Sequence, residues 1–244
     1  MPIITLTTDF GTGSPYVAAM KAVILGTAPD VTLVDISHDV PPFDMAQCAF
    51  VLWLGTRHFQ PGVVHVGVVD PGVGTERRPI AFGLNGSFYV GPDNGLFDMV
   101  IRESENAPID IFQLHRPTGI SATFEGRDVF APTAAALALG RSLSDLGQPV
   151  AGPLVKLPAQ GPAVVWVDRF GNLITNLKPP VTALHVNGHD VHVLARTFGD
   201  MPTDQPFVYV GSMGFIAIGV ARGRADVALE AHAGNAGEGA LAGA

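Results

Sequence analysis

The chain has few charged residues and no cluster of basic ones. Asp, Glu, Lys and Arg together make up 15% of its 244 residues, and the formal net charge is −8. Nucleic acids and anionic membranes are bound through grouped Lys and Arg side chains, so this balance excludes both as expected partners. With so few charged side chains, part of the surface must be formed by uncharged and apolar ones, and this favours burial of that surface by self-association.

Cysteine is nearly absent, and so are long apolar runs. Cys48 is the single cysteine, so the chain cannot form an internal disulfide or a cysteine-based zinc site, and we expect Cys48 to be buried. No apolar run reaches the roughly 18 residues that a membrane span needs. The first residues lack the basic and apolar segments of a signal peptide, which predicts a cytoplasmic location.

Histidine is present, but without the spacing typical of metal ligands. None of the eight histidines belongs to an HExxH or comparable pattern. His189 and His192 are three positions apart in an expected strand, where such residues point to opposite faces. The sequence therefore predicts no metal site.

Short apolar runs alternate with segments of helical periodicity in the first part of the chain. Strand, helix, strand, helix and strand are expected over residues 3–7, 16–25, 31–36, 45–58 and 63–69. This order predicts an α/β domain with a mainly parallel central sheet. Ser14-Pro15 marks the start of the first helix, Asp44 is the expected N-cap of the second, and Asn85-Gly86 predicts a two-residue hairpin turn.

The composition changes after residue 140, where Pro and Gly become frequent and helical periodicity ends. We therefore expect an N-terminal α/β domain at 1–150, a linker at 151–160 and a smaller C-terminal domain at 161–244. Short apolar strands with regular turns predict that the C-terminal domain is a small all-β barrel or sandwich. The Gly/Ala-rich tail at 231–244 is expected to fray.

The stretch HVGVVDPGVGTERR, at 65–78, carries the clearest functional signal. It is an apolar strand that ends at Asp70, followed by a Gly-rich turn and two arginines, and the first strand ends similarly at Asp9. Ligands of α/β proteins collect at the carboxyl ends of strands, and the turn can bring Arg77 or Arg78 back to Asp70 as a charge partner. The alternative is an ordinary Asp–Arg pair at a strand end, without a function.

Five motifs, taken together and in this order, closely resemble those of one family. They are LTTDFGTGSPYVAAMKAVIL, VVDPGVGTERR, GPDNGLF, TFEGRDVFAP and DRFGNLITN. They match the S-adenosylmethionine (SAM) hydrolases that form adenosine, also called SAM hydroxide adenosyltransferases. The resemblance runs from about residue 3 to about residue 225. The same superfamily contains SAM-dependent fluorinases and chlorinases.

This resemblance implies an α/β N-terminal domain joined to a C-terminal β-barrel, in a homotrimer. SAM is then held between the N-terminal domain of one subunit and the C-terminal domain of the next, and no metal or organic cofactor is used. The implied reaction is attack of a water on the ribose C5′, with methionine leaving. Because a sulfonium is already an activated leaving group, the site has only to hold the water in line with the C5′–S bond and accept its proton.

Three residues carry the implied catalytic role. Asp70 and Arg77 match the family's Asp and Arg around the attacking water, with Arg77 keeping Asp70 ionised. Glu125 departs from the family, because these hydrolases usually have a histidine at its position. A carboxylate can also accept a proton, but close to Asp70 it raises the pKa of one of the two unless an arginine compensates. Arg127 can pair with Glu125 or with Asp128.

The adenosine half of the implied substrate site matches the family. Asp9 corresponds to the aspartate that binds both ribose hydroxyls, a role suited to a bidentate acceptor. Phe170 and Asn172 correspond to the adenine contacts, which are an aromatic face and an amide. Phe198 provides a second apolar wall.

The methionine half departs from the family. Ser212 matches a serine near that end, but Ser14 replaces an aspartate that contacts the methionine ammonium, and Ala217 replaces a glutamate. The alternatives to a SAM hydrolase are a non-catalytic protein that binds adenosine or SAM, a hydrolase with another leaving group, and a halogenase-like enzyme. Asp70 argues against a halogenase, because a carboxylate beside the nucleophile repels a halide and accepts a water.

Overall fold

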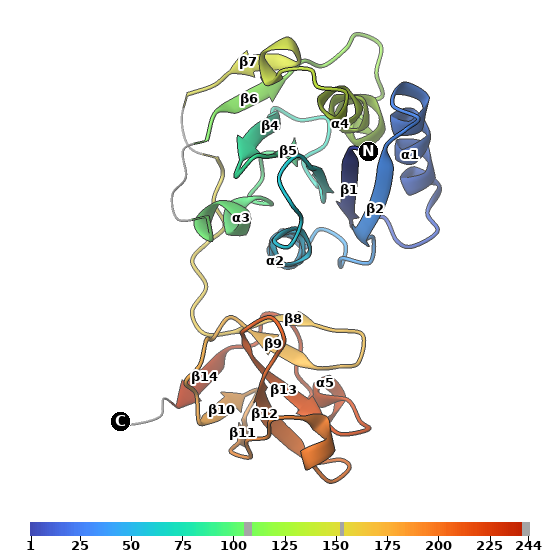
Figure 1. Cartoon of the computed structure of the whole chain (residues 1–244). Helices are drawn as coiled ribbons and strands as arrows, with labels where there is room; N and C mark the ends of the chain where they lie inside the picture. Colours follow the sequence, from blue (N-terminus) through green and yellow to red (C-terminus); the bar gives the residue numbers. More distant parts are fainter. Residues whose placement is uncertain (105–108, 152–153, 241–244) are drawn as a thin grey trace. The chain divides into compact units, whose positions relative to one another are not determined.

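The computed structural model describes residues 1–104, 109–151 and 154–240 (Figure 1). The chain forms two compact units, Met1–Leu157 and Pro158–Ala244. Their boundary falls within the segment 151–160, where the composition indicates a linker. Among the described residues, no helix is long and apolar enough to cross a membrane.

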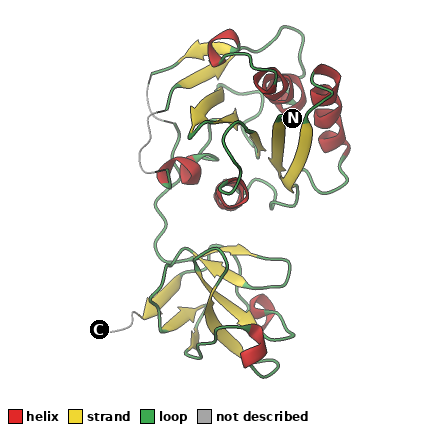
Figure 2. Cartoon of the chain, viewed as in Figure 1, coloured by secondary structure: helices red, strands yellow, loops and turns green. Residues whose placement is uncertain are grey.

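The N-terminal unit is built on a seven-stranded sheet (Figure 2). Its strands, in their order across the sheet, are β2 (Thr32–Ser37), β1 (Ile3–Thr8), β3 (Val64–Val68), β5 (Ser87–Pro92), β4 (Pro79–Leu84), β6 (Ile111–Leu114) and β7 (Gly147–Pro149). The first four are parallel, and the remaining pairings are antiparallel. The expected mainly parallel sheet is therefore a mixed one, because the Asn85-Gly86 turn reverses the chain between β4 and β5, and β6 and β7 extend the sheet from there.

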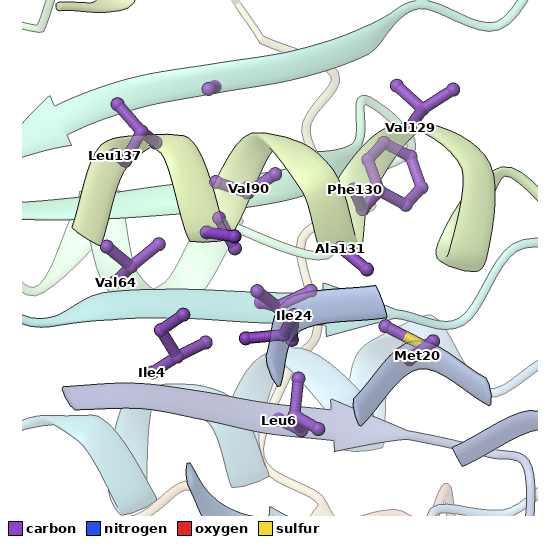
Figure 3. Packing of buried hydrophobic residues seen from close by; sticks show 14 of the residues in the cluster. Ile4, Leu6, Met20, Ile24, Val64, Val90, Val129, Phe130, Ala131 and Leu137 are labelled. Atoms are coloured by element: carbon purple, nitrogen blue, oxygen red, sulfur yellow. The ribbon is translucent and has the colours of Figure 1, made fainter. Parts of the chain in front are cut away.

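Helices cover both faces of this sheet. They are α1 (Pro15–Thr27), α2 (Met45–Thr56), α3 (Asp98–Arg102) and α4 (Ala131–Ala138). α1 and α4 pack on one face, and α2 and α3 pack on the other. Figure 3 shows the first core, where Ile24 and Leu137 from the two helices pack with Ile4 and Val64 from β1 and β3. Burying each such side chain contributes about 2 kcal/mol, so this core fixes the position of the two strands.

Capping residues begin both long helices at the positions that the sequence predicts. The Ser14 hydroxyl accepts a hydrogen bond from the Tyr16 backbone N–H at 3.2 Å, and the Asp44 carboxylate accepts one from the Gln47 N–H at 2.9 Å. Each bond satisfies a backbone donor that has no partner within the helix. Cys48 is buried in α2, as predicted.

A π-helical turn, Gly126–Phe130, leads directly into α4. The sequence predicts only a turn followed by an alanine-rich helix here, because a π-turn has no composition of its own. Such turns are rare and are frequent at functional sites. Glu125 immediately precedes this turn.

The C-terminal unit contains two antiparallel sheets. Their strands are β11 (His189–Val191), β10 (Ala183–Val186) and β14 (Gly237–Ala240) in one, and β12 (Pro206–Val210), β13 (Ile216–Val220), β9 (Leu173–Thr175) and β8 (Val164–Val167) in the other. Residues of both sheets, including Leu184 and Ile218, share one core with the short helix α5 (Ala225–Ala228). A short 3-10 helix lies at Phe198–Asp200 in this unit, and another lies at Leu143–Asp145 in the N-terminal unit.

Three strands, β7, β10 and β14, are not anticipated by the sequence pattern. The expectation that the tail frays is wrong for β14, which pairs with β10 along its length. β7 closes one edge of the N-terminal sheet through backbone bonds to β6. β7 and β14 are rich in Gly and Pro or Ala, so their pairing rests on backbone hydrogen bonds rather than on side-chain alternation. Residues 241–244, the end of the tail, lie outside the described part of the chain.

Candidate active site

Two carboxylates follow neighbouring parallel strands. β1 and β3 pair with Thr8 opposite Val68, so Asp9 and Asp70 lie just beyond the same edge of the sheet. Both line a cleft of about 310 Å³, and Glu125 lines it as well. The structure thus brings together three predicted site residues that are far apart in the sequence. Strand ends of this kind are where α/β sheets bind ligands.

The turn after β3 brings Arg77 back to this edge. The Thr75 N–H and hydroxyl both donate to the Gly72 carbonyl, at 3.2 and 2.6 Å, which closes the turn. Gly74 has a φ of 78°, and a Cβ there would lie 2.5 Å from the carbonyl oxygen of Ala122. Only glycine tolerates both this conformation and this approach, so the turn packs directly on the segment that leads to the π-helical turn.

Arg77 binds two carboxylates at once. Its Nε donates to Asp70 Oδ1 at 3.1 Å, and its Nη2 donates to Asp70 Oδ2 and, at 2.6 Å, to Glu125 Oε2. The guanidinium carbon also lies 5.6 Å from the ring centroid of buried Phe130. Nη1 is buried and has no hydrogen-bond partner among the described residues. Arg78 pairs elsewhere in the unit, so Arg77 is the arginine that the turn returns to Asp70.

Burial and charge act in opposite directions on Asp70. Burial raises the pKa of its carboxyl group, the Arg77 guanidinium lowers it, and the Glu125 carboxylate raises it again. The pKa of Asp70 remains above its ordinary value. A carboxylate of raised pKa in a cleft is well suited to accept a proton.

Glu125 is the most buried of the three carboxylates, with 2% of its surface exposed. Besides the bond from Arg77, its Oε1 accepts one from Arg116 Nε at 2.5 Å. Arg116 lies just after β6, and the sequence gives no sign of this contact. Arg127, the partner suggested by proximity in the chain, binds Asp128 instead. Two arginines therefore bind Glu125, and neither is its neighbour in sequence.

Aromatic side chains form one wall of the cleft. Phe10, Tyr16 and Phe124 contact one another, with ring centroids 5.1 to 6.0 Å apart. On another side, the Phe43 backbone N–H donates to Asp9 Oδ2 at 3.0 Å and holds that carboxylate in place. Sequence reasoning did not single out these aromatic residues, although three of them stand within the quoted motifs.

The C-terminal unit has a separate groove of about 470 Å³. It is lined by Phe170, Asn172, Phe198 and Ser212, the four residues that the sequence assigns to substrate contacts in this domain, and by Ala217. Phe170 is 75% exposed and Phe198 is 40% exposed. Large aromatic rings exposed beside an amide are suited to bind a flat heteroaromatic ligand.

Asp168 organises one side of this groove. Its carboxylate accepts the N–H groups of Phe170 and Asn172, each at 2.9 Å, and the Asn172 Nδ2 at 2.7 Å. A Cβ on Gly219 would lie 2.8 Å from Phe198 and 3.2 Å from Asn172 Oδ1, so glycine permits the close packing here. Sequence reasoning missed Asp168, although it begins the DRFGN motif.

Ser14 and Ser212 lie in different surroundings. Ser14 caps α1 and does not line the N-terminal cleft, although Tyr16 does. Ser212 lies in the turn between β12 and β13, on the groove of the C-terminal unit. The geometry within each unit therefore does not by itself bring these two serines together.

Fold and site define a protein with an α/β unit, whose cleft is lined by carboxylates and aromatic rings, and a mainly β unit with an aromatic groove. The family models then identify it more closely. The N-terminal domain of SAM hydroxide adenosyltransferases matches residues 4–147, and their C-terminal domain matches residues 162–237. The chain belongs to the SAM hydroxide adenosyltransferase family.

Relatives and solved structures agree with this assignment. A protein of Thermus thermophilus named (R)-S-adenosyl-L-methionine hydrolase is 42% identical, over 91% of this chain and 92% of its own. One of the same name from Salinispora arenicola is 41% identical over 92% of both chains. A fluorinase of an Actinoplanes species is more distant, at 26% identity over 89% and 90%. The crystal structure of an uncharacterized conserved protein from Thermotoga maritima superposes with a TM-score of 0.90 at 32% identity, covering 97% of this chain and all of the other.

Proposed function

We propose that this protein hydrolyses SAM to adenosine and L-methionine by attack of a positioned water on the ribose C5′. Its family and the names of its hydrolase relatives support the reaction. Within this chain, the observation that carries the proposal is the bidentate pair between Arg77 and Asp70 at the edge of an aromatic cleft. A carboxylate held this way can accept a proton from a water beside it.

In the proposed reaction, the water oxygen forms a bond to C5′ while the C5′–S bond breaks. The bonding electron pair goes to sulfur, and the sulfonium becomes a neutral thioether, so the leaving group requires no metal or organic cofactor. Asp70 accepts the water proton and later releases it to solvent. Arg77 orients Asp70, and its Nη1, which has no partner among the described residues, is available to bond the water. Glu125 binds the other side of Arg77 and fixes its position.

Adenosine contacts are proposed in both units. Asp9 is held by the Phe43 N–H and binds the ribose hydroxyls. The exposed rings of Phe170 and Phe198 contact the faces of adenine. Since the Asn172 Nδ2 already donates to a carboxylate, its Oδ1 is the atom that accepts from the adenine amino group.

The two units need each other for this site, and we infer a homotrimer in which the α/β unit of one subunit meets the C-terminal unit of the next. The family resemblance supports this arrangement, as does the division of the proposed adenosine contacts between the units. The low charge content leaves surface for such contacts. We further propose that the two sheets of the C-terminal unit form its β-barrel.

The methionine end is assigned to the two serines, Ser14 and Ser212, with Ala217 nearby on the C-terminal side. Ser14 and Ala217 lack the charges of the aspartate and the glutamate that the family resemblance implies at these two positions. The Thermus thermophilus and Salinispora arenicola relatives are named for the (R) form of the sulfonium. We propose that this chain also prefers (R)-SAM.

The test is to incubate the purified protein with each SAM epimer in water enriched in oxygen-18. The proposal expects adenosine with one heavy oxygen at the 5′ hydroxyl, unlabelled methionine, and faster conversion of the (R) epimer. Binding of adenosine by calorimetry without any conversion would support the non-catalytic alternative. Addition of fluoride or chloride should leave adenosine as the product, and a 5′-halogenated nucleoside would overturn hydrolysis.

A further inference from the structure

Glu125 adds a second buried negative charge to the cleft, and this charge needs a cation to compensate it. It is almost fully buried, and it shares the Nη2 of Arg77 with Asp70. One guanidinium cannot neutralise two buried carboxylates, and a second uncompensated charge in such a place favours protonation of one of the pair. With a single arginine, the charge of Glu125 would therefore act more strongly on Asp70 and raise its pKa further.

Arg116 supplies the second positive charge. Its Nε donates to Glu125 Oε1 at 2.5 Å, and its Nη2 donates to the backbone carbonyl of Arg77 at 2.6 Å. The first contact neutralises Glu125, and the second ties Arg116 to the residue that holds Asp70. The cluster formed by the side chains of Asp70, Arg77, Glu125 and Arg116 therefore carries no net charge. Arg116 remains partly accessible, with 34% of its side chain exposed, whereas the other three are at most 7% exposed.

Other charged groups near the cluster do not replace Arg116. Arg127 and Asp128, on the π-helical turn that follows Glu125, bind each other. Asp9 lines the same cleft and adds negative charge rather than compensating it. Among the charged groups that the structure describes around Glu125 and Asp70, Arg77 and Arg116 are thus the cations in contact.

We propose that Arg116 is a positioning residue that offsets the negative charge of Glu125, so that this charge acts less on Asp70, and that holds Arg77 in place to orient Asp70 as the proton acceptor. The proposal rests on the proposed hydrolysis of SAM and adds a residue to it. Arg116 touches neither the water nor the substrate in this scheme. It acts through Glu125 and the backbone of Arg77. In this proposal, the buried carboxylate at position 125 is compatible with a base at Asp70 because the guanidinium of Arg116 compensates its charge.

The central experiment is the pH profile of kcat/KM for Arg116→Met. Without the second cation, the uncompensated negative charge of Glu125 should raise the pKa of Asp70, so the acid limb should move up by about one pH unit, with KM for SAM changed less than about twofold. Arg116→Lys keeps the charge and should keep the acid limb near its wild-type position. The double variant Arg116→Met/Glu125→Gln removes both charges and should move the limb back toward the wild-type position. Arg141→Met, at an exposed surface pair of the same unit, is the matched control and should change nothing.

A second measurement does not depend on turnover. Titration of carbon-13-labelled carboxyl groups by NMR, with the Asp70 signal assigned through Asp70→Asn, should show a higher pKa for Asp70 in Arg116→Met than in the wild type. An unchanged acid limb together with an unchanged Asp70 titration would overturn the role of Arg116. If the wild type hydrolyses no SAM, the proposed function fails while the titration still decides the charge pairing. Should Arg116→Met not fold, folding of the double variant supports the pairing, and failure of both assigns Arg116 a purely structural role.

Discussion

Burial and the charge of Arg77 act in opposite directions on the pKa of Asp70, and their balance determines how readily its carboxylate accepts a proton. Burial favours the neutral acid, whereas Arg77 favours the carboxylate and fixes both of its oxygens. A carboxylate stabilised only by charge would be a weak base. One that is partly desolvated holds a proton more readily, which is the property needed to accept one from water.

Replacing Asp70 by Asn keeps the shape of the side chain and removes the proton acceptor. We expect kcat for SAM to fall by about 10²- to 10⁴-fold, the range typical of general-base removal, with the Kd for adenosine nearly unchanged. Chromatography of the adenosine formed and calorimetry of adenosine binding measure the two effects. A variant that keeps most of its turnover would exclude Asp70 from the mechanism.

The raised pKa of Asp70 sets the direction of two pH effects. Because the base must be ionised, kcat/KM should fall as the pH drops through a pKa above the usual aspartate value. The stability effect has the opposite sign: a carboxyl whose pKa is higher in the folded state stabilises the fold below its unfolded pKa and loses that contribution as the pH rises through the folded pKa. Both effects should disappear in Asp70→Asn, as measured by pH–rate profiles and by thermal unfolding over the same pH range. An acid limb that persists unchanged in the residual activity of Asp70→Asn would assign it to another group.

Phe170 is the clearest test of the adenine contacts. Stacking of a base on an aromatic ring contributes about 1–3 kcal/mol, so Phe170→Ala should weaken adenosine binding by about 5- to 150-fold. Val227→Ala is a suitable control, because Val227 is 69% exposed in the same unit and lies outside the groove. Equal affinities of the two variants would show that the exposed ring does not stack on the ligand.

Among the local structural elements, the turn after β3 links the strand to the Arg77–Asp70 pair at the cleft. It packs against the segment before the π-helical turn through the close approach of Gly74 to Ala122. Asp70 stands at one end of this turn and Arg77 near the other, and the segment it touches continues to Glu125. The distance between the carboxylates therefore depends on backbone packing and not only on their ion pairs.

Gly74→Ala tests this dependence. The left-handed φ alone costs about 1 kcal/mol for alanine, and the added Cβ must also push the Ala122 carbonyl away. Gly119→Ala is a matched control, since Gly119 has a φ of 79° but open space around its Cα. Both variants should lower the unfolding temperature, and only Gly74→Ala should lower kcat strongly. Similar kcat values for the two would contradict the role of the close approach.

For the chain as a whole, the proposed sharing of each site between two subunits can be tested by mixing variants. Asp70→Asn is defective in the α/β unit, and Phe170→Ala/Asn172→Ala is defective in the C-terminal unit. If sites form between neighbouring subunits of a ring, every mixed trimer has one intact site, so refolding the two variants together should restore about a quarter of wild-type activity. Sites contained within single chains would give no recovery, and sedimentation analysis of the same samples reports the oligomeric state.

Much of the architecture is already determined by local patterns in the sequence. The βαβαβ order, the caps at Ser14 and Asp44 and the Asn85-Gly86 hairpin depend on residues close together in the chain, and the structure has all of them. The same logic finds Asp9 and Asp70, because a strand that ends in a carboxylate places it at the sheet edge. The short turn also limits how far Arg77 and Arg78 can lie from Asp70, but it does not choose between them; the resemblance implies Arg77, and the structure has Arg77 on Asp70.

The remaining features depend on contacts between distant segments, and only the tertiary structure decides them. The position of β7 at the edge of the sheet and the pairing of β14 with β10 rest on backbone hydrogen bonds, which leave little trace in side-chain periodicity. The partner of Glu125 in the cleft could not be predicted from the sequence either. Arg127, its neighbour in the chain, binds Asp128, and the arginine that compensates Glu125 is Arg116, which lies just after β6. A buried charge must be matched by whichever cation the fold brings next to it, and that choice is made in space rather than along the chain.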